Sequence, residues 1–428
     1  MAYAVYEELQ SSSIPWFDEI PLHWREVRLK WTIESGCKNG VWGGEPNGLD
    51  DILCIRVADF DRKQFKLRDD KLTIRAVEYK DRNGRLLQPG DLLLEKSGGG
   101  EGQLVGAVSQ YTFTSEAVCS NFVASMRAGE EYDSRYITYL HAHLYSSKVN
   151  YRSIKQTTGI QNLDSQQYFD EIVFIAALEE QQKIAAFLDY KTQQIDQLIE
   201  KKRALIEKLE EKRITVITQA VTKGLDKNAK LKPSGVDWLG DVPEHWGVRR
   251  LKFMASIENG RDYKDVEVEE DGYPVYGSGG EFRRASSYLY EGESVLFGRK
   301  GTIDKPLYVN GRFWTVDTMF YSEILANTNP SFLYYSALTF QYQTLATQTA
   351  LPSITQNDLE NYLLCYPSME EQKSIVLFLE KQCKKIDQML EINNRAMEAL
   401  EEYRSAIITS AVTGKIDVRE FALPKEAA

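Results

Sequence analysis

Two long stretches of the chain carry apolar residues at the spacing of an amphipathic helix. From Glu179 to Ala220 there is no proline and no glycine, and charged residues are dense. Apolar residues recur there every three or four positions, at Ile184, Phe187, Leu188, Ile195, Leu198, Ile199, Leu205, Ile206, Leu209, Val216 and Ile217. The second stretch has them at Ile375, Phe378, Leu379, Ile386, Met389, Leu390, Met397, Leu400, Ile407 and Ile408. This period predicts two helices of about 40 residues, each on the order of 60 Å long.

Two pairs of segments repeat along the chain. Residues 16–24 recur as residues 238–246, an offset of 238 − 16 = 222 residues. Residues 179–188 recur as residues 370–379, an offset of 370 − 179 = 191, so the stretch between the matching segments is 222 − 191 = 31 residues longer in the first copy. A unit whose ends repeat while its interior differs is typical of a fixed frame that holds two different binding domains.

The predicted helices are longer than ordinary globular helices, which favours a coiled coil. Lys202 and Asn393 occupy seam positions where leucine would pack better, and a buried polar residue there can set the register of the two helices. Because the helices belong to equivalent repeats, antiparallel packing would place the two globular domains at opposite ends, related by a pseudo-twofold axis.

The interiors of the two copies have the pattern of mixed α/β domains. We predict strands at 52–57, 91–94 and 294–297, glycine-rich turns at 97–102 and 298–301, and aromatic-rich helices at 136–144 and 332–340. The expected architecture is two α/β (α+β) domains joined by two long helices in an antiparallel coiled coil. The expected boundaries are 1–163 for the first domain with its proximal segment, 164–233 for the first helical region, 234–354 for the second domain with its proximal segment, and 355–428 for the second helical region.

Composition and charge limit the possible functions. With 428 residues, of which 43% are hydrophobic, the chain can bury more than one core. Its longest apolar runs fall short of the roughly 20 residues that a membrane span needs, so we expect a cytoplasmic protein. The net charge of −11 argues against a protein that coats DNA non-specifically, so any contact with DNA must be local. The segment from Arg62 to Arg85 contains nine basic residues and only four acidic ones, which fits either such a local surface or an ordinary solvated face.

Patterns for catalysis, metal binding or nucleotide binding are weak. The five cysteines form no CxxC pair, which predicts free thiols and no zinc site. His141 and His143 point to different faces of a helix, so packing explains them better than metal binding. The glycine-rich turns lack the GxxxxGK[ST] pattern of a phosphate loop. Asn329-Pro330-Ser331-Phe332 is similar to a signature of amino-methyltransferases, but we predict a helix start with Asn329 as N-cap and Pro330 in the first turn.

Several side chains on the glycine-flexible turns suit nucleic-acid binding. A cation on such a turn lets the backbone approach a phosphate or a groove closely, and polar side chains can read base edges. Each residue taken alone also fits a solvated hairpin turn. The candidate DNA-binding residues are Lys96, Ser97, Tyr276, Ser278, Arg283, Arg284, Arg299 and Lys300.

Taken together, the repeated motifs resemble the specificity subunit of Type I restriction-modification systems, over almost the whole chain. The motifs that carry the resemblance are Pro21-Leu-His23-Trp24, Pro243-Glu-His245-Trp246, Glu180-Gln181, Glu371-Gln372, and the run from Gly298 through Trp314 to Phe320. The family often has a Leu-Pro-Pro stretch before the Glu-Gln pair, which Ala176-Ala177-Leu178 and Pro367-Ser368-Met369 replace here. The first interior matches the family less clearly than the second.

This resemblance implies a non-catalytic subunit that binds no cofactor itself. Its two target-recognition domains would each read one half of a bipartite, asymmetric DNA sequence, and the helical rod would set the unread spacer. Two modification subunits would bring S-adenosylmethionine and methylate adenine N6, while restriction subunits would use ATP and Mg²⁺ to cut unmodified DNA. The alternatives are a stand-alone two-domain DNA-binding protein and a coiled-coil adaptor between two protein-binding domains.

Overall fold

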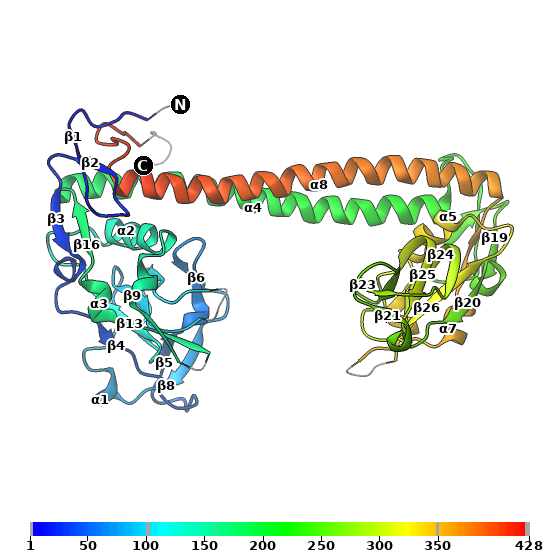
Figure 1. Ribbon diagram of the computed structural model, residues 1–428, viewed down its shortest axis with the longest axis horizontal. Coiled ribbons are helices and arrows are strands. Elements are labelled where there is room, and N and C mark those ends of the chain that lie inside the picture. The colour runs from blue at the N-terminus through cyan, green and yellow to red at the C-terminus, as the bar shows by residue number, and fades with distance from the viewer. Residues whose placement is uncertain (1–2, 100–102, 158, 348–350, 424–428) are drawn as a thin grey trace. The chain divides into compact units, whose positions relative to one another are not determined.

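The computed structural model describes residues 3–99, 103–157, 159–347 and 351–423 (Figure 1). The chain divides into two compact units, of which unit 1 comprises Met1–Lys202 with Arg395–Ala428 and unit 2 comprises Arg203–Asn394. Each unit therefore combines one α/β domain with half of each long helix. In the part of the chain that the structure describes, no helix combines the length and the apolar character that a membrane span requires.

The two predicted long helices are α4 (Leu178–Lys223) and α8 (Met369–Val412). In unit 1 Asp196 of α4 pairs with Arg404 of α8 at 3.0 Å, and in unit 2 Arg213 of α4 pairs with Asp387 of α8 at 2.7 Å. Early residues of one helix thus meet late residues of the other, so the helices run antiparallel. Since 387 − 196 and 404 − 213 both equal 191, the two ion pairs are the same pair in the two copies.

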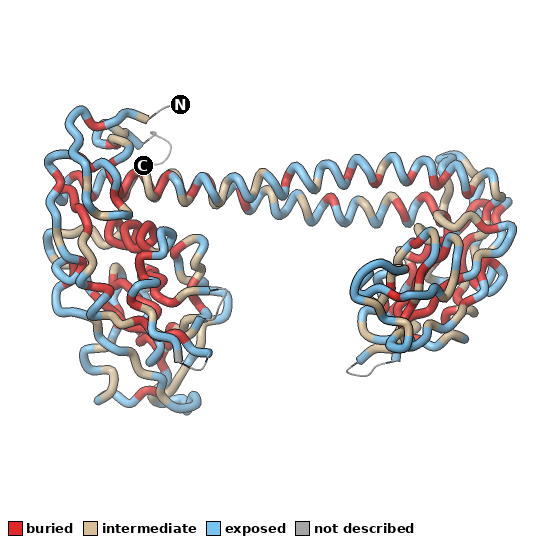
Figure 2. Tube along the Cα trace, viewed as in Figure 1, coloured by how far each residue is buried: buried red, intermediate tan, exposed pale blue. Residues whose placement is uncertain are grey.

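Buried residues recur along both long helices, as Figure 2 shows, because each turns one apolar stripe toward its neighbours. Asn393, predicted at a seam position, is 6% exposed, and its side-chain amide donates to the carbonyl of Met389. A polar group in this seam therefore has a hydrogen-bond partner on its own helix.

The domain of unit 1 contains several small sheets around one aromatic-rich helix. Its strands are β1 (Leu9–Ser11), β2 (Glu19–Pro21), β3 (Arg25–Arg28), β4 (Lys38–Asn39), β5 (Asp51–Ile55), β6 (Phe60–Asp61), β7 (Lys66–Leu67), β8 (Thr73–Ala76), β9 (Leu92–Glu95), β10 (Ser97–Gly98), β11 (Val108–Gln110), β12 (Ala117–Cys119), β13 (Val123–Met126), β14 (Ile154–Thr157), β15 (Ile160–Leu163) and β16 (Ile172–Ile175). Its short helices are α1 (Tyr79–Arg82), α2 (Ser134–Ser146) and α3 (Ser165–Phe169). The central sheet has the order β11-β9-β13-β4, and β10 joins the β14–β15 hairpin in a separate sheet.

Helix α2 lies in the core of unit 1. The Asp133 carboxylate accepts hydrogen bonds from two backbone N–H groups of the first turn, which is the role of an N-cap. Residues 136–144 are all buried, so the helix packs on every side rather than along one stripe. His141 bonds the Tyr168 hydroxyl at 2.8 Å and His143 bonds the carbonyl of Trp16 at 3.0 Å, which confirms that both histidines serve packing.

The domain of unit 2 is built on a seven-stranded sheet. Its order is β20-β26-β24-β25-β22-β23-β21, with β22 and β25 parallel. The strands of unit 2 are β17 (Leu231–Pro233), β18 (Asp241–Pro243), β19 (Gly247–Arg250), β20 (Ala255–Asn259), β21 (Glu267–Val268), β22 (Tyr273–Gly277), β23 (Gly280–Ala285), β24 (Tyr290–Gly298), β25 (Leu307–Thr315), β26 (Met319–Ile324) and β27 (Leu363–Tyr366). Its short helices are α5 (Pro330–Ala337), α6 (Tyr342–Leu345) and α7 (Gln356–Glu360).

The predicted elements of the interiors are present with small shifts in their ends. The strands expected at 52–57, 91–94 and 294–297 correspond to β5, β9 and β24. The expected helix 136–144 lies within α2, whereas the helix expected at 332–340 is α5 and ends at Ala337. Asn329 caps α5 by accepting from the backbone N–H of Phe332 at 3.0 Å, and Pro330 begins the helix, so the helix-start interpretation is confirmed.

Candidate nucleic-acid interface

In unit 1 the proximal segment, residues 16–30, is anchored to the start of α4 by one carboxylate. Glu180 accepts hydrogen bonds from the Trp24 indole at 3.1 Å and from the Tyr6 hydroxyl at 2.6 Å. The His23 ring lies 2.8 Å from the other carboxylate oxygen. Burial and the neighbouring Glu180 charge both raise the pKa of Tyr6, which keeps its hydroxyl a donor. These contacts join the two repeated segments of the unit, the proximal segment and the start of the long helix.

The same anchor recurs in unit 2, where residues 238–252 form the proximal segment. Glu371 accepts from the Trp246 indole at 2.9 Å, and the His245 ring lies 2.7 Å from the same oxygen. Burial opposes the ionisation of Glu371, but hydrogen bonds from His245, Trp246 and Ser368 outweigh it and lower its pKa to about 2. The repeated His-Trp and Glu-Gln motifs are therefore structural, since they hold each domain on its helix.

The glutamine next to each anchoring glutamate holds the aromatic-rich helix of its domain. The Gln181 side chain accepts from the backbone N–H of Asp133 at 3.0 Å, and Gln372 accepts from the backbone N–H of Asn329 at 2.7 Å. Asp133 and Asn329 are the N-caps of α2 and α5. Each domain is thus attached to its long helix through the same two neighbouring side chains.

At each predicted glycine-rich turn two polar residues directly precede a glycine, and we call this pair the tip of its domain: Lys96–Ser97 in unit 1 and Arg299–Lys300 in unit 2. The tip of unit 1 lies where β9 ends. The backbone N–H groups of Lys96 and Ser97 both donate to the carbonyl of Phe122, at 2.8 and 3.3 Å. The carbonyl of Lys96 accepts from the backbone N–H of Leu163 at 2.8 Å. The Lys96 ammonium donates to the side-chain oxygen of Asn39 at 2.5 Å, so this cation is tied to β4.

The second predicted tip, in unit 2, repeats this backbone pattern. The N–H groups of Arg299 and Lys300 donate to the carbonyl of Thr318, at 2.8 and 3.3 Å, and the carbonyl of Arg299 accepts from Ile354 at 3.0 Å. Arg299 and Lys300 are therefore the structural counterparts of Lys96–Ser97. Both turns need glycine, because Gly98 has φ +131° and Gly301 has φ +84°.

In unit 2 the first residue of the tip is held by its own domain and the second is exposed, whereas in unit 1 Lys96 and Ser97 are both half-buried and both are held by their own domain. The Arg299 guanidinium donates to the carbonyl of Asp317 at 3.4 Å. Lys300 is exposed, and its ammonium makes no hydrogen bond or ion pair with the residues that the structure describes. The Ser97 hydroxyl donates to the side-chain oxygen of Asn162, an exposed residue on β15, at 2.5 Å. Sequence reasoning missed Asn162. The alternating pattern of 160–163 could have indicated a strand, but it could not have shown that this strand pairs with β10, which carries Ser97.

Tyr276 and Ser278 lie beside the tip of unit 2. The carbonyl of Tyr276 accepts from the backbone N–H of Val316 at 3.1 Å, and its ring meets that of Phe313 edge to face. A Cβ atom placed on Gly301 would lie 3.8 Å from the Ser278 hydroxyl oxygen, so the two turns are neighbours.

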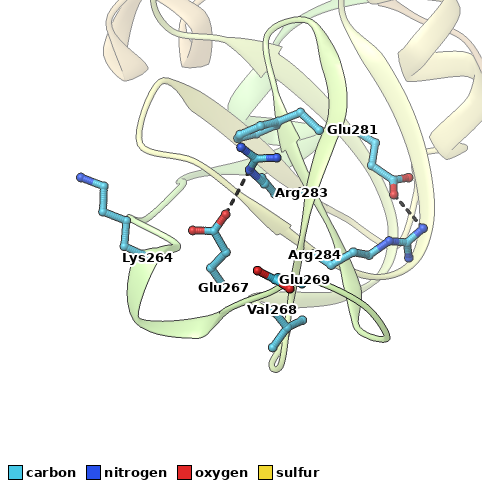
Figure 3. Close-up of a pocket in the computed structure, with 8 residues that line it drawn as sticks. Lys264, Glu267, Val268, Glu269, Glu281, Arg283 and Arg284 are labelled. Carbon is cyan, nitrogen blue, oxygen red and sulfur yellow. Dashed lines mark ion pairs between the residues drawn. The ribbon is translucent and has the colours of Figure 1, made fainter.

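Arg283 and Arg284 lie on β23 and line a groove of about 880 Å³ (Figure 3). Arg283 pairs with Glu267 at 3.0 Å, and Arg284 pairs with Glu281 at 2.8 Å. The structure therefore gives both arginines carboxylate partners that the sequence pattern did not reveal. A phosphate would have to compete with these carboxylates.

Much of the basic stretch from Arg62 to Arg85 is neutralised within unit 1. Its ion pairs are Arg62 with Glu95 (2.6 Å), Lys63 with Glu401 (2.8 Å), Lys66 with Asp196 (3.1 Å) and Arg75 with Glu45 (2.6 Å). Glu95 is fully buried, and burial raises its pKa although the Arg62 guanidinium opposes the shift. These cations serve mainly to hold loops, which favours the solvated-face alternative over a phosphate-binding surface.

Within the described ranges, no three His, Cys, Asp or Glu side chains gather in a way that could hold a metal ion.

Comparisons with known proteins converge on one family. Residues 243–401 match the Type I restriction modification DNA specificity domain. The chain is similar to the type I restriction enzyme MjaVIII specificity subunit of Methanocaldococcus jannaschii, with 27% identity over 317 residues that cover 65% of this chain and 70% of the relative.

Two solved structures share the fold. One was solved in a study of complex assembly and conformational transition of the type I R-M system; it has a TM-score of 0.71 and 15% identity, and covers 92% of this chain and 98% of that one. The other is the HsdS subunit from Thermoanaerobacter tengcongensis, with a TM-score of 0.52, 15% identity and coverage of 93% and 98%. Both share the arrangement of mixed α/β domains on long helices.

Proposed function

We propose that the chain is a specificity subunit of the type I restriction-modification kind and that it reads a bipartite DNA target through its two dissimilar domains. The observation that carries this proposal is the equivalence of the two tips. Lys96–Ser97 and Arg299–Lys300 occupy the same backbone position on the same frame, yet present different side chains. Equal placement with unequal chemistry is what two readers of two different half-sites require.

The reading surface in each domain centres on its tip. In unit 1 it includes Lys96 and Ser97, and in unit 2 it includes Arg299 and Lys300 with the neighbouring turn that carries Tyr276 and Ser278. Arg283 and Arg284 lie to the side of this surface and contribute contacts to phosphate once it displaces their glutamates.

The partners of the subunit supply the chemistry and most of the grip on DNA. Two modification subunits bring S-adenosylmethionine and methylate adenine, and restriction subunits bring ATP and Mg²⁺. The net charge of −11 supports this division, because a chain with more acidic than basic residues gains little from sequence-independent attraction to phosphate.

An exchange of one domain tests the proposal. The segment from Thr32 to Leu163 is replaced by the corresponding segment of another family member, while the anchors at Trp24 and Glu180 stay in place. The chimera is expressed with the modification subunits, and the methylated motif is determined by sequencing of modified DNA. We expect one half-site to change and the other to remain, whereas a change in both half-sites would refute independent reading by the two domains.

A further inference from the structure

Each tip has an exposed hydrogen-bond donor beside it or within it. In unit 1, Ser97 on β10 is the register partner of Asn162 on β15, and its hydroxyl donates to the Asn162 side-chain oxygen at 2.5 Å. Along β15 the exposed residues Ile160 and Asn162 alternate with the buried residues Gln161 and Leu163. Asn162 therefore points outward, beside the tip, with its amide oxygen already engaged and its NH₂ group available.

Unit 2 has a comparable arrangement with a different side chain. Lys300 forms an isolated β-bridge with Ser353, just as Ser97 pairs with Asn162. The exposed Lys300 ammonium can only donate hydrogen bonds. Both tips thus offer a donor at the corresponding place, from Asn162 in one domain and from Lys300 in the other.

We propose that Asn162 and Lys300 are specificity-determining residues that read a base with hydrogen-bond acceptors on its major-groove edge. This inference rests on the proposed function. Guanine presents two acceptors there, N7 and O6, whereas cytosine presents only the N4 donor. Each domain therefore accepts guanine best and rejects cytosine at the position that its tip contacts, with adenine N7 and thymine O4 as single acceptors between these extremes.

The residue before each reader acts as a positioning residue. Lys96 is held by Asn39 and Arg299 by the carbonyl of Asp317, so both long side chains tie the reading surface to its own domain. They keep the tip backbone in place while the next residue, or its register partner, reaches the base.

The test reverses the hydrogen-bonding character of each reader in the complete subunit, co-expressed with its modification partners. Asn162→Asp keeps the size of the side chain and the oxygen that accepts from Ser97, but replaces the donor with an acceptor. Lys300→Glu likewise replaces a donor with an acceptor in unit 2, on a shorter side chain. We expect each variant to lose its preference for guanine at one position of one half-site by at least about fivefold, and to gain tolerance of cytosine there.

A matched control lies on the same hairpin. Lys155 of β14 is exposed, is the register partner of Asn162 and pairs with Asp164 at 2.7 Å, so Lys155→Ala removes a cation directly beside Asn162 and leaves the Asn162 amide itself in place. The DNA motif methylated by the complex that carries this variant is expected to be unchanged. Asn162→Ala serves as a second variant, which removes the donor without adding charge and is expected to weaken discrimination at the same position.

The outcomes separate the inference from the proposed function. If Asn162→Asp and Lys300→Glu both leave the methylated motif intact while the domain exchange alters one half-site, the reading residues are elsewhere and only the inference fails. If the domain exchange itself alters neither half-site, the proposed function fails. Loss of preference at the same single position in Asn162→Asp and Asn162→Ala supports the inference.

Discussion

The two units share one ion pair on their helices but use it differently. In unit 1 the Arg404 side chain is 4% exposed, and besides Asp196 it donates to the carbonyls of Lys63 and Gln64 at 3.0 and 2.7 Å. In unit 2 the counterpart Arg213 is 35% exposed and pairs with Asp387. The same repeat position is thus a buried junction in one unit and a partly exposed surface pair in the other.

This difference follows from the longer interior of the first copy. Gly40 and Gly260 are counterparts, because their N–H groups donate to the carbonyls of Val123 and Met319, which follow the residues that hold the two tips. From these glycines to Lys96 and Arg299 the distances are 96 − 40 = 56 and 299 − 260 = 39 residues, so 17 of the extra residues lie in this segment of unit 1. The β6–β7 loop that meets Arg404 lies within this segment.

The β6–β7 loop binds the first domain to its helices at a second place. Lys63 also pairs with Glu401, and Lys66 with Asp196, on the same helices. The β6–β7 loop therefore braces the first domain against the long helices. The comparison teaches that a repeated frame can carry domains that differ in how firmly they are held.

The largest difference between the units is expected in acid. Burial lowers the pKa of His141 to about 3 and that of His143 to about 4, whereas an unfolded histidine titrates near 6.5. The unfolded chain then binds more protons, so this contribution to stability is full above pH 6.5 and falls as the pH drops toward the folded values. At pH 4.5 each histidine lowers the stability of unit 1 by about 2–3 kcal/mol relative to neutral pH.

Hydrogen exchange at pH 7 and pH 4.5, corrected for intrinsic rates, measures this effect for each unit. Peptides of unit 1 should lose protection, while those of unit 2, whose His245 side chain is 60% exposed, should change little. The variant His141→Asn with His143→Gln should flatten the acid response of unit 1. Parallel losses in both units, or an unaltered response in the variant, would contradict the prediction.

The second prediction removes the junction itself. Arg404→Ala leaves Asp196 and two carbonyls without their guanidinium and is expected to lower the free energy of unfolding by about 3 kcal/mol. The matched change Arg213→Ala breaks a partly exposed pair and should cost about 1 kcal/mol or less. Chemical denaturation of both variants measures the two losses in the free energy of unfolding. Equal losses would show that the contacts of Arg404 with the β6–β7 loop add no stability.

The third prediction concerns the glycine after each long helix. Gly414 has φ +72° and Gly224 has φ +76°, so alanine is strained by about 1 kcal/mol at either position. At Gly414 an added Cβ would also lie 2.2 Å from the Cδ atom of Pro21, while at Gly224 the first contact is the Trp246 ring at 3.1 Å. Gly414→Ala should therefore reduce stability by about 2–3 kcal/mol and Gly224→Ala by roughly 1–2 kcal/mol. Thermal unfolding of the two variants measures these losses. A larger loss of stability in Gly224→Ala than in Gly414→Ala would refute the prediction.

The smallest effect is expected in the groove of unit 2. Arg283→Ala combined with Arg284→Ala should reduce the slope of log affinity for DNA against log salt by less than about 2, because both arginines start paired with glutamates. Glu267→Gln frees Arg283 and should steepen the slope by up to about 1. The measurement is a salt titration of DNA binding by the assembled complex; identical slopes in all three proteins would exclude the groove from the interface.

The parts of the candidate site that sequence reasoning could predict are those set by residues a few positions away along the chain. The pairing of Lys96–Ser97 with Arg299–Lys300 could be predicted because each pair follows a buried strand and precedes glycine. Asn162 and Glu267 could not be predicted. Asn162 reaches Ser97 only when β15 pairs with β10, and the carboxylate beside Arg283 becomes visible only when β21 pairs with β23.

The chain's own order of residues determined the repeat, the two long helices and the cap at Asn329, since periodicity and capping depend on neighbours a few positions away. Only the tertiary structure decided which charges are neutralised and which remain outward. Arg62, Arg283 and Lys300 all belong to basic segments, yet the first two meet carboxylates 33 and 16 positions away along the chain, at Glu95 and Glu267. Electrostatic pairing depends on distance in space, and that distance is set by how strands far apart in the chain come to lie together.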